Sequence, residues 1–201
     1  MSIIYYKNKA KTIFKSYLYL LKNNKKKFSI GSANTVIGKD WFSTDIDELN
    51  IIKEKDWANL LWFIRLDNIV AEHVWEHLNE SDTSAANRNC FKFLKKYGIM
   101  RIAVPDGFHP DNNYIDYVKP GGHGAGADDH KILYNYKSMS KKLEESGFKV
   151  ELLEYWDENG KFHFTEWSDD GGRISRSKRY DDRNVNGELK YTSLIVDAIK
   201  I

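Results

Sequence analysis

The segment Lys27–Asp47 reads KFSIGSANTVIGKDWFSTDID and predicts two short strands of a parallel sheet. Apolar residues mark the first strand at Phe28–Ile30 and the second at Trp41–Thr44. Small residues form the turn after the first strand: Gly31, Ser32 and Ala33. In parallel α/β sheets, ligands bind beyond the carboxyl ends of the strands, where small residues let the backbone approach and an acid can accept both ribose hydroxyls. Because Asp45 and Asp47 end the second strand, the segment predicts a nucleotide site.

The turn departs from the three-glycine fingerprint of dinucleotide-binding proteins. Ala33 and Thr35 stand where that fingerprint has glycine. The spacing from Gly31 to Asp45 is also shorter than the about 20 residues of the fingerprint, so a helix between the two strands is at most about two turns long. These departures keep a second interpretation open: a regulatory module that binds a nucleotide but does not catalyse a reaction.

The composition is that of one globular domain, residues 1–201. With 41% hydrophobic residues and only 3 prolines, the chain is expected to fold compactly rather than stay disordered. Its 31 basic and 29 acidic side chains give a net charge of +2, so no global field favours nucleic acid. Cys90 has no cysteine partner for an internal disulfide, and no apolar run approaches the about 18 residues of a membrane span. We therefore expect a cytoplasmic protein without stable membrane insertion, whose oligomeric state the sequence does not decide.

Residues 1–26 are expected to form an N-terminal helical extension. Between Lys9 and Leu21 apolar residues recur at helical spacing, with lysines between them. We expect the apolar face of this amphipathic helix to pack on the sheet and its lysines to be solvated. The alternative is a helix that meets a membrane surface or an acidic partner.

Strand and helix signals alternate in the middle of the chain. Leu49–Ile52 is compatible with a further short strand, and Lys55–Leu61 with a short helix. The nearly continuous apolar run Asp67–Ala71 is typical of a central strand buried on both faces. A helical pattern follows, with Gly98 placed as its C-cap, and Ile99–Val104 is the next strand. The alternation predicts a parallel sheet with right-handed crossovers.

The segment 107–129 has no periodicity and contains several glycines, so we expect an irregular loop that acts as an active-site lid. A helix is then predicted at Ser138–Ser146. The pair Asn159-Gly160, between two alternating segments, predicts a β-hairpin. Thr192–Ile199 is the last expected strand, and it closes the sheet in antiparallel orientation.

Several strings, in this order, resemble the class I S-adenosylmethionine-dependent methyltransferases. They are FSIGSA with STDID, DNIVAEHVWEHL, CFKFLKKYGIMRIAVPD and LEESGFKVELLEY. The resemblance covers roughly residues 27–201. Within the family, the chain looks most similar to small predicted methyltransferases, type 11-like, often associated with surface-polysaccharide biosynthesis. The implied fold is α/β and Rossmann-like, with a mostly parallel sheet, an antiparallel C-terminal strand and the N-terminal helical extension.

The resemblance also implies a cofactor, S-adenosylmethionine, and the residues that bind it. The small residues of the first turn would hold the methionine part through their backbone: Gly31, Ser32 and Ala33. Asp45, with Asp47 beside it, would hold the ribose, and Asp56 or Trp57 would flank the adenine. Glu72, at the end of the central strand, would face both cofactor and acceptor. The implied acceptor is a small molecule, first of all a sugar or sugar conjugate.

A base that takes the acceptor proton is expected among the residues around the predicted methyl group. An unperturbed imidazole titrates near neutral pH, whereas the pKa of a carboxylate must be raised by burial before it can serve. We therefore expect His130 to be the base, His73 to be the reserve and Glu72 to orient the acceptor or the base.

Two groups of residues have the side-chain types of a metal site. His73, Glu76 and His77 spell H-x-x-E-H, which on a helix is the signature of inverted zinc peptidases. No third ligand follows on a second helix, so a zinc peptidase is a remote alternative; otherwise Glu76 and His77 brace the helix that they begin.

Acidic and imidazole side chains of the glycine-rich loop are the second possibility: His123, Asp128, Asp129 and His130. Because loop carboxylates are usually solvated, we expect no metal there. Three arginines of the polar segment after the hairpin are expected to be solvated, with binding of a substrate phosphate or carboxylate as the alternative: Arg173, Arg176 and Arg179.

Overall fold

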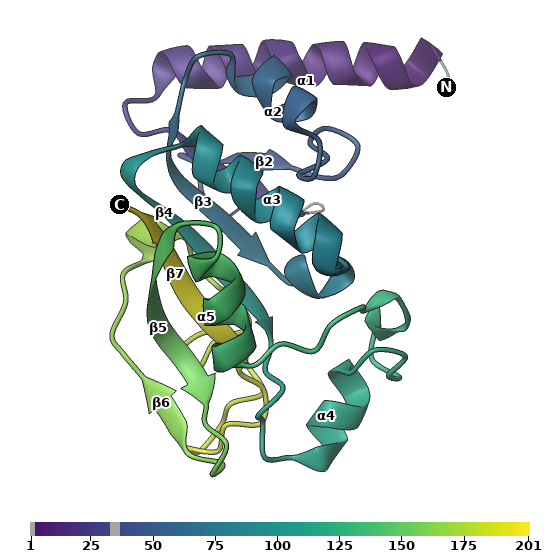
Figure 1. Ribbon diagram of the computed structural model, residues 1–201, viewed down its shortest axis with the longest axis vertical. Helices are drawn as coiled ribbons and strands as arrows, with labels where there is room; N and C mark the ends of the chain where they lie inside the picture. Colours follow the sequence, from purple (N-terminus) through teal and green to yellow (C-terminus); the bar gives the residue numbers. More distant parts are fainter. Residues whose placement is uncertain (1–2, 33–36) are drawn as a thin grey trace.

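The computed structural model describes residues 3–32 and 37–201. In these residues seven strands form one sheet in the order β2-β1-β3-β4-β7-β5-β6 (Figure 1). The strands are β1 (Lys27–Ile30), β2 (Phe42–Thr44), β3 (Leu66–Glu72), β4 (Leu94–Pro105), β5 (Phe148–Trp156), β6 (Phe162–Phe164) and β7 (Ser193–Lys200). The helices are α1 (Ile3–Lys22), α2 (Glu54–Leu61), α3 (Glu80–Phe93), α4 (Asn112–Val118) and α5 (Tyr136–Glu144), with short 3-10 helices η1 (Trp75–His77), η2 (Ala127–Asp129) and η3 (Asp169–Gly171).

The sheet is mostly parallel, as expected. Strand β1 pairs in parallel with β2 on one side and β3 on the other, and β3 pairs in parallel with β4. Strand β7 lies antiparallel between β4 and β5, and β6 completes the hairpin with β5. The predicted α/β, Rossmann-like fold with an antiparallel C-terminal strand is therefore confirmed.

Alternation along the central strands separates two hydrophobic clusters, one on each face of the sheet. In β3, Ile69 and Ala71 belong to the larger cluster, whereas Val70 between them belongs to the smaller one. The larger cluster also contains buried residues of α1, α2, α3 and α5. The smaller cluster includes Trp167 and Ile174, so the irregular segment after β6 covers the face opposite the helices.

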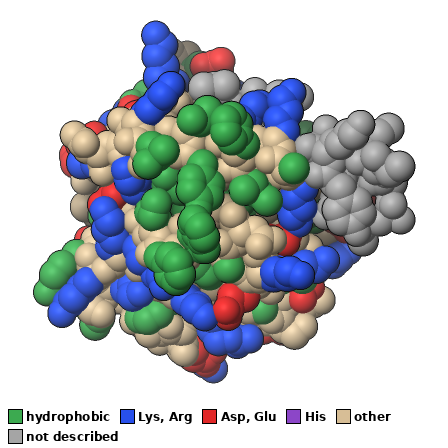
Figure 2. All heavy atoms as spheres, turned by 90° about the horizontal axis from the view of Figure 1, so that it is seen from above, with side chains coloured by type: hydrophobic (Ala, Val, Ile, Leu, Met, Phe, Trp, Pro, Cys, Tyr) green, Lys and Arg blue, Asp and Glu red, His purple; other side chains and the backbone are tan. Residues whose placement is uncertain are grey.

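The outer side of α1 carries exposed apolar residues. Phe14 and Leu21 are 65% and 77% exposed, and Tyr17 contacts the exposed Trp62 edge to face. Figure 2, which looks down on this end of the molecule, shows apolar side chains gathered in one patch with lysines and arginines around it. Among the described residues, no helix is both long and apolar enough to cross a membrane.

Two elements differ from the sequence-based expectation. Leu49–Ile52 is not a strand but a turn segment, whose buried Leu49 and Ile51 belong to the larger cluster. The Ile51 carbonyl accepts hydrogen bonds from the Trp57 indole and the Asn89 amide, both at 2.9 Å, so side chains satisfy a backbone group that a strand would have paired.

Gly98 is the second difference, because α3 ends at Phe93 and Gly98 lies inside β4. The pairing with β3 passes from Leu66 opposite Leu94 to Asn68 opposite Ile99, so the extra residues of β4 form an irregularity. A Cβ atom at position 98 would lie 2.9 Å from the Lys95 carbonyl oxygen and 3.1 Å from that of Asp67. Gly98 thus permits close backbone approach rather than a helix end.

The expected irregular loop 107–129 contains α4 and η2 and is anchored to the sheet. Tyr114 of α4 is 4% exposed; its hydroxyl accepts a hydrogen bond from the Asp106 amide and donates one to the Thr192 carbonyl, both at 3.1 Å. The loop expectation was therefore wrong for residues 112–118, where the buried Tyr114 and Val118 order a helix of 7 residues that is too short for its periodicity to stand out in the sequence.

A buried ion pair joins β4 to β7. The Arg101 guanidinium, with Arg101 3% exposed, donates two hydrogen bonds of 2.8 Å to the Asp197 carboxylate directly opposite. It also donates to the carbonyls of Ser168 (2.7 Å) and Gly172 (2.8 Å) and lies over the Trp167 ring. The guanidinium therefore holds the segment around η3 against the sheet.

Asp197→Ala should lower the free energy of unfolding by about 3–5 kcal/mol, because a buried guanidinium loses its counter-charge. Lys149→Ala, which breaks the exposed pair with Glu151, should cost at most about 1 kcal/mol. Urea unfolding of the two variants measures both values. Equal, small losses would mean that the carbonyls alone compensate Arg101.

Candidate active site

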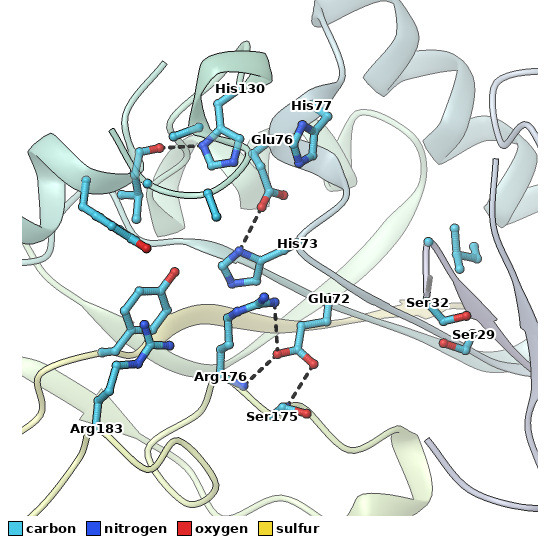
Figure 3. Close-up of a pocket in the computed structure, with 18 of the residues that line it drawn as sticks. Ser29, Ser32, Glu72, His73, Glu76, His77, His130, Ser175, Arg176 and Arg183 are labelled. Atoms are coloured by element: carbon cyan, nitrogen blue, oxygen red, sulfur yellow. Dashed lines mark hydrogen bonds and ion pairs between the residues drawn. The ribbon is translucent and has the colours of Figure 1, made fainter. Parts of the chain in front are cut away.

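A cavity of about 530 Å³ opens at the carboxyl ends of β1 and β3 (Figure 3). Strands β2 and β3 pair with opposite edges of β1, so the strand order reverses at β1. The cavity lies at this point, which is the usual ligand position in α/β sheets. Residues of β1 and its turn, of β3 and η1, of segment 117–130 and of segment 175–191 line it. They include Ser29, Gly31, Ser32, Glu72, His73, Glu76, His77, Tyr117, His130, Ser175, Arg176, Arg183 and Tyr191.

The turn after β1 follows the expected geometry. Gly31 has φ +60°, and a Cβ atom there would lie 2.5 Å from Cγ2 of Val74. The Ser32 amide donates to the Thr44 carbonyl at 3.1 Å, which ties the turn to the end of β2. Gly31 and Ser32 both line the cavity, whereas Ala33 and Thr35 lie outside the described residues.

Glu72 ends β3 at the cavity but is held by the C-terminal segment. Its carboxylate accepts hydrogen bonds from the backbone amides of Ser175 (3.0 Å) and Arg176 (2.7 Å), and the Arg176 guanidinium lies 3.7 Å away. The acid is thus oriented by two fixed donors, which suits a group that positions its neighbours.

His73 and Glu76 form the next layer of the cavity wall. His73 has φ +57°; its Nε2 lies 3.0 Å from Oγ of Ser193, and its Nδ1 lies 3.1 Å from Oε1 of Glu76. Glu76 is 1% exposed, and neither carboxylate oxygen has a partner of hydrogen-bond geometry among the described residues.

His77 and His130 approach each other beside Glu76. Their ring centroids are 4.8 Å apart, edge to face. His130 Nδ1 lies 2.6 Å from the Val118 carbonyl oxygen, and His77 Nδ1 lies 3.3 Å from Oδ2 of Asp129. The predicted residues His130, His73 and Glu72 therefore all border one cavity.

The polar segment near the C-terminus supplies residues that sequence patterns did not single out. Arg183 lies 3.5 Å over the ring of Tyr191, and both line the cavity together with Arg176, one of the three arginines that were expected to be solvated. Burial raises the pKa of Tyr191 to about 12, so its hydroxyl stays a hydrogen-bond donor at neutral pH. Arg173 and Arg179 contact Tyr180 instead and do not line the cavity. No periodic pattern distinguishes these arginines, because the segment that carries them is irregular and is placed at the cavity by the long-range contact of Arg176 with Glu72.

Two expected adenine contacts are not at the cavity. Trp57 is fully buried in the larger cluster, and its indole N–H is taken by the Ile51 carbonyl. The Asp56 carboxylate, 7% exposed as a residue, binds the Lys9 ammonium at 2.7 Å and the Asn50 amide at 3.2 Å. Neither side chain is free to flank an adenine in this conformation, which corrects that expectation.

The structure also places the two aspartates predicted to bind the ribose and the residues of the two possible metal sites. Asp45 is partly exposed just after β2, Asp47 is exposed, and neither residue lines the cavity. The H-x-x-E-H motif begins at the end of β3 and continues into the 3-10 helix η1, so its histidines are not on an α-helix as a zinc peptidase requires. His123 and Asp128 are exposed and do not line the cavity.

Gly31→Ala should lower the free energy of unfolding by about 1–2 kcal/mol for the positive φ, with a further loss of about 1–3 kcal/mol for the overlap with Val74. Gly160→Ala is the matched control, because Gly160 has φ +71° and its nearest neighbour lies at an ordinary 3.5 Å. In a Val74→Ala background, Gly31→Ala should cost no more than Gly160→Ala does. Urea unfolding measures the cycle, and an unchanged cost in that background would refute the overlap.

Solved structures share the fold of the whole chain. A chain of the complex between the Haloferax volcanii Trm112 methyltransferase activator and a candidate methyltransferase superposes with a TM-score of 0.50 at 10% identity, over 92% of this chain and 88% of that one. A SAM-dependent methyltransferase of Thermotoga maritima gives 0.50 at 8% identity, over 94% and 88%. The CurJ carbon methyltransferase gives 0.50 at 13%, over 94% and 54%. No protein-family model and no curated protein matches the chain. The chain therefore has the fold of S-adenosylmethionine-dependent methyltransferases.

Proposed function

We propose that the protein is an S-adenosylmethionine-dependent methyltransferase that acts on a small polar acceptor. The observation that carries the proposal is the cavity at the carboxyl ends of β1 and β3, where the Gly31 turn and a set of histidine, glutamate and arginine side chains face the same space. Its volume of about 530 Å³ is in the range of small-molecule sites.

The turn at Gly31 and Ser32 fits the cofactor. A glycine without Cβ at a positive φ brings the backbone to the cavity wall, where it can meet the amino-acid part of the ligand. Because the Ser32 amide binds the Thr44 carbonyl, Asp45 follows directly on the β2 side of this turn. Asp45 is not part of the cavity lining, and we assign it the ribose hydroxyls from its place in the sequence beside the turn. When bound, S-adenosylmethionine supplies a methyl group already activated by its sulfonium.

The remaining wall favours a polar acceptor. Arg176, whose guanidinium lies 3.7 Å from Glu72, is the guanidinium proposed for a phosphate or carboxylate, and the Tyr191 hydroxyl offers a further donor. Arg183 also lines the wall, but its guanidinium binds the Asp181 carboxylate through two hydrogen bonds of 2.7 and 2.6 Å. Such a surface suits a sugar or sugar conjugate, the acceptor class that the sequence resemblance favours. Segment 107–129 contributes Tyr117 and Val118 to the same wall, and we propose it as a lid that excludes water during transfer.

The chain's own part in the reaction is to align the acceptor and to manage its proton. Alignment at near-contact distance supplies much of the rate gain in such transfers. A carbonyl oxygen only accepts, so the short contact to Val118 puts the proton of a neutral His130 on Nδ1 and leaves a lone pair on Nε2. His130 is thus prepared to act on the acceptor proton, while Glu72 stays oriented by its two backbone donors.

Asp45→Ala should weaken binding of S-adenosylmethionine and its demethylated product by about 2–4 kcal/mol, or about 30- to 700-fold, because two hydrogen bonds to a charged acceptor are lost. Asp47→Ala, at an exposed neighbouring carboxylate, should change affinity less. Titration calorimetry measures both. If neither ligand binds the unaltered protein, the methyltransferase proposal fails; if Asp45→Ala binds normally, only the role of Asp45 fails.

His130→Ala should reduce turnover about 100-fold or more and leave cofactor affinity nearly unchanged, as expected when an interaction acts mainly in the transition state. Turnover is followed as release of the demethylated cofactor with fractionated cell extract as the source of acceptor. His163→Ala is the control, because His163 lies on β6, binds the Asp157 carboxylate and is not part of the cavity lining. Cofactor binding without turnover in any fraction would favour the non-catalytic module.

A further inference from the structure

We propose that Glu76, His77 and His130 bind one divalent transition-metal ion in the wall of the cavity. One potential ligand atom from each residue lies within 4.8 Å of those from the other two (Figure 3). The three residues come from η1 and from the end of the segment that follows α4, so only the folded chain brings them together.

The first observation is that the buried Glu76 carboxylate accepts no hydrogen bond from the described residues. With Glu76 1% exposed, neither oxygen has a hydrogen-bond partner in the described part of the chain. An uncompensated buried carboxylate costs several kcal/mol by an order-of-magnitude argument. The nearest polar group is Nδ1 of His73, which lies 3.1 Å from Oε1, within ion-pair distance but outside hydrogen-bond geometry. A cation held by Glu76 would compensate this charge directly.

The second observation is the orientation of the two imidazoles. Nδ1 of His130 faces the Val118 carbonyl, and Nδ1 of His77 faces the Asp129 carboxylate. Both partners accept, so each neutral ring carries its proton on Nδ1 and keeps the Nε2 lone pair. Metal-ligating histidines usually donate their other ring N–H to a carbonyl or carboxylate in this way.

The ligand set indicates the kind of ion. Two imidazoles and one carboxylate suit Zn²⁺, Mn²⁺, Fe²⁺ or Co²⁺ better than Mg²⁺ or Ca²⁺, which prefer oxygen. Three protein ligands leave coordination positions open. Because all three residues line the cavity, the open positions face the space proposed for the acceptor. The His77 side chain is 32% exposed, so its ring has room to move closer to the ligand atoms of Glu76 and His130 when an ion binds.

The role of the ion deepens the proposed methyltransferase function and rests on it. An acceptor hydroxyl held at an open position would be oriented for transfer, and its pKa would fall toward neutrality, so that its proton could pass to water. The acceptor oxygen would then form a bond to the methyl carbon as the carbon–sulfur bond of the sulfonium breaks, which leaves the demethylated cofactor. His130 would then serve as a ligand that places the ion, and the ion would do the work first expected of a free imidazole base. Vicinal hydroxyls of a sugar would offer two oxygens to such an ion.

The test measures metal binding on tag-free, chelator-treated full-length protein. Titration calorimetry with Mn²⁺ and with Zn²⁺, and the visible absorption of added Co²⁺, should show one ion per chain. Glu76→Gln, His77→Ala and His130→Ala should each weaken binding at least about 10- to 100-fold, whereas His163→Ala should bind as the unaltered protein does. No stoichiometric binding, or full binding in Glu76→Gln and His130→Ala, would overturn the site.

Thermal unfolding guards against variants that only fail to fold. Glu76→Gln removes the buried charge but keeps the shape of the side chain. The metal-free variant should therefore melt at least as high as the metal-free parent, but added ion should not raise its melting temperature. A variant that melts lower without metal and is still stabilised by added ion would refute the role of Glu76.

Cofactor affinity of the metal-free protein separates the two proposals. If the protein binds the demethylated cofactor but no metal, the methyltransferase proposal is retained and the metal site is refuted. If it binds metal but no cofactor, the metal site is retained and the methyltransferase proposal is refuted. If both bind, turnover should fall at least about 10-fold without metal; unchanged turnover would return His130 to the role of a free base.

Discussion

The buried guanidinium of Arg101 is the charge on which the arrangement of the cavity depends. Paired with Asp197 across β4 and β7, it donates two further hydrogen bonds to the carbonyls of Ser168 and Gly172. Those contacts fix the start of a long irregular segment against the face of the sheet opposite the helices. Farther along this segment, the backbone amides of Ser175 and Arg176 reach Glu72 at the end of β3. One desolvated charge therefore orders the chain that closes one side of the site.

The cavity is composite for the same reason. Strands β1 and β3 supply the turn at Gly31 and the acid Glu72, η1 supplies Glu76 and His77, the segment after α4 supplies His130, and the C-terminal segment supplies Arg183 and Tyr191. The parallel strands set the position, because their carboxyl ends meet where the strand order reverses. The chemistry comes from loops that the sheet and a few buried polar contacts hold in place, which is common in enzymes of this architecture.

Local sequence signals located most of the fold. Apolar runs marked β1, β3, β4 and β7, and Asn159-Gly160 marked the β5-β6 hairpin, since strand burial and turn chemistry act within a few residues. The failures were also physical. Gly98 looked like a helix cap, but it is required by the approach of the Lys95 and Asp67 carbonyls. Leu49–Ile52 looked like a strand, but its Ile51 carbonyl accepts hydrogen bonds from side chains of α2 and α3.

The sequence by itself determined the edge of the sheet that carries the site, because Gly31, Glu72 and His73 stand at strand ends that periodicity can locate. Only the tertiary structure decided which other residues join them. It placed Trp57 in the core, brought Arg183 and Tyr191 to the cavity, and set His77 against His130 beside an unpartnered Glu76. These relations depend on contacts between distant residues, such as His73 with Ser193, 120 positions apart. A local pattern holds no information on such contacts, since they form only when the sheet brings its loops together.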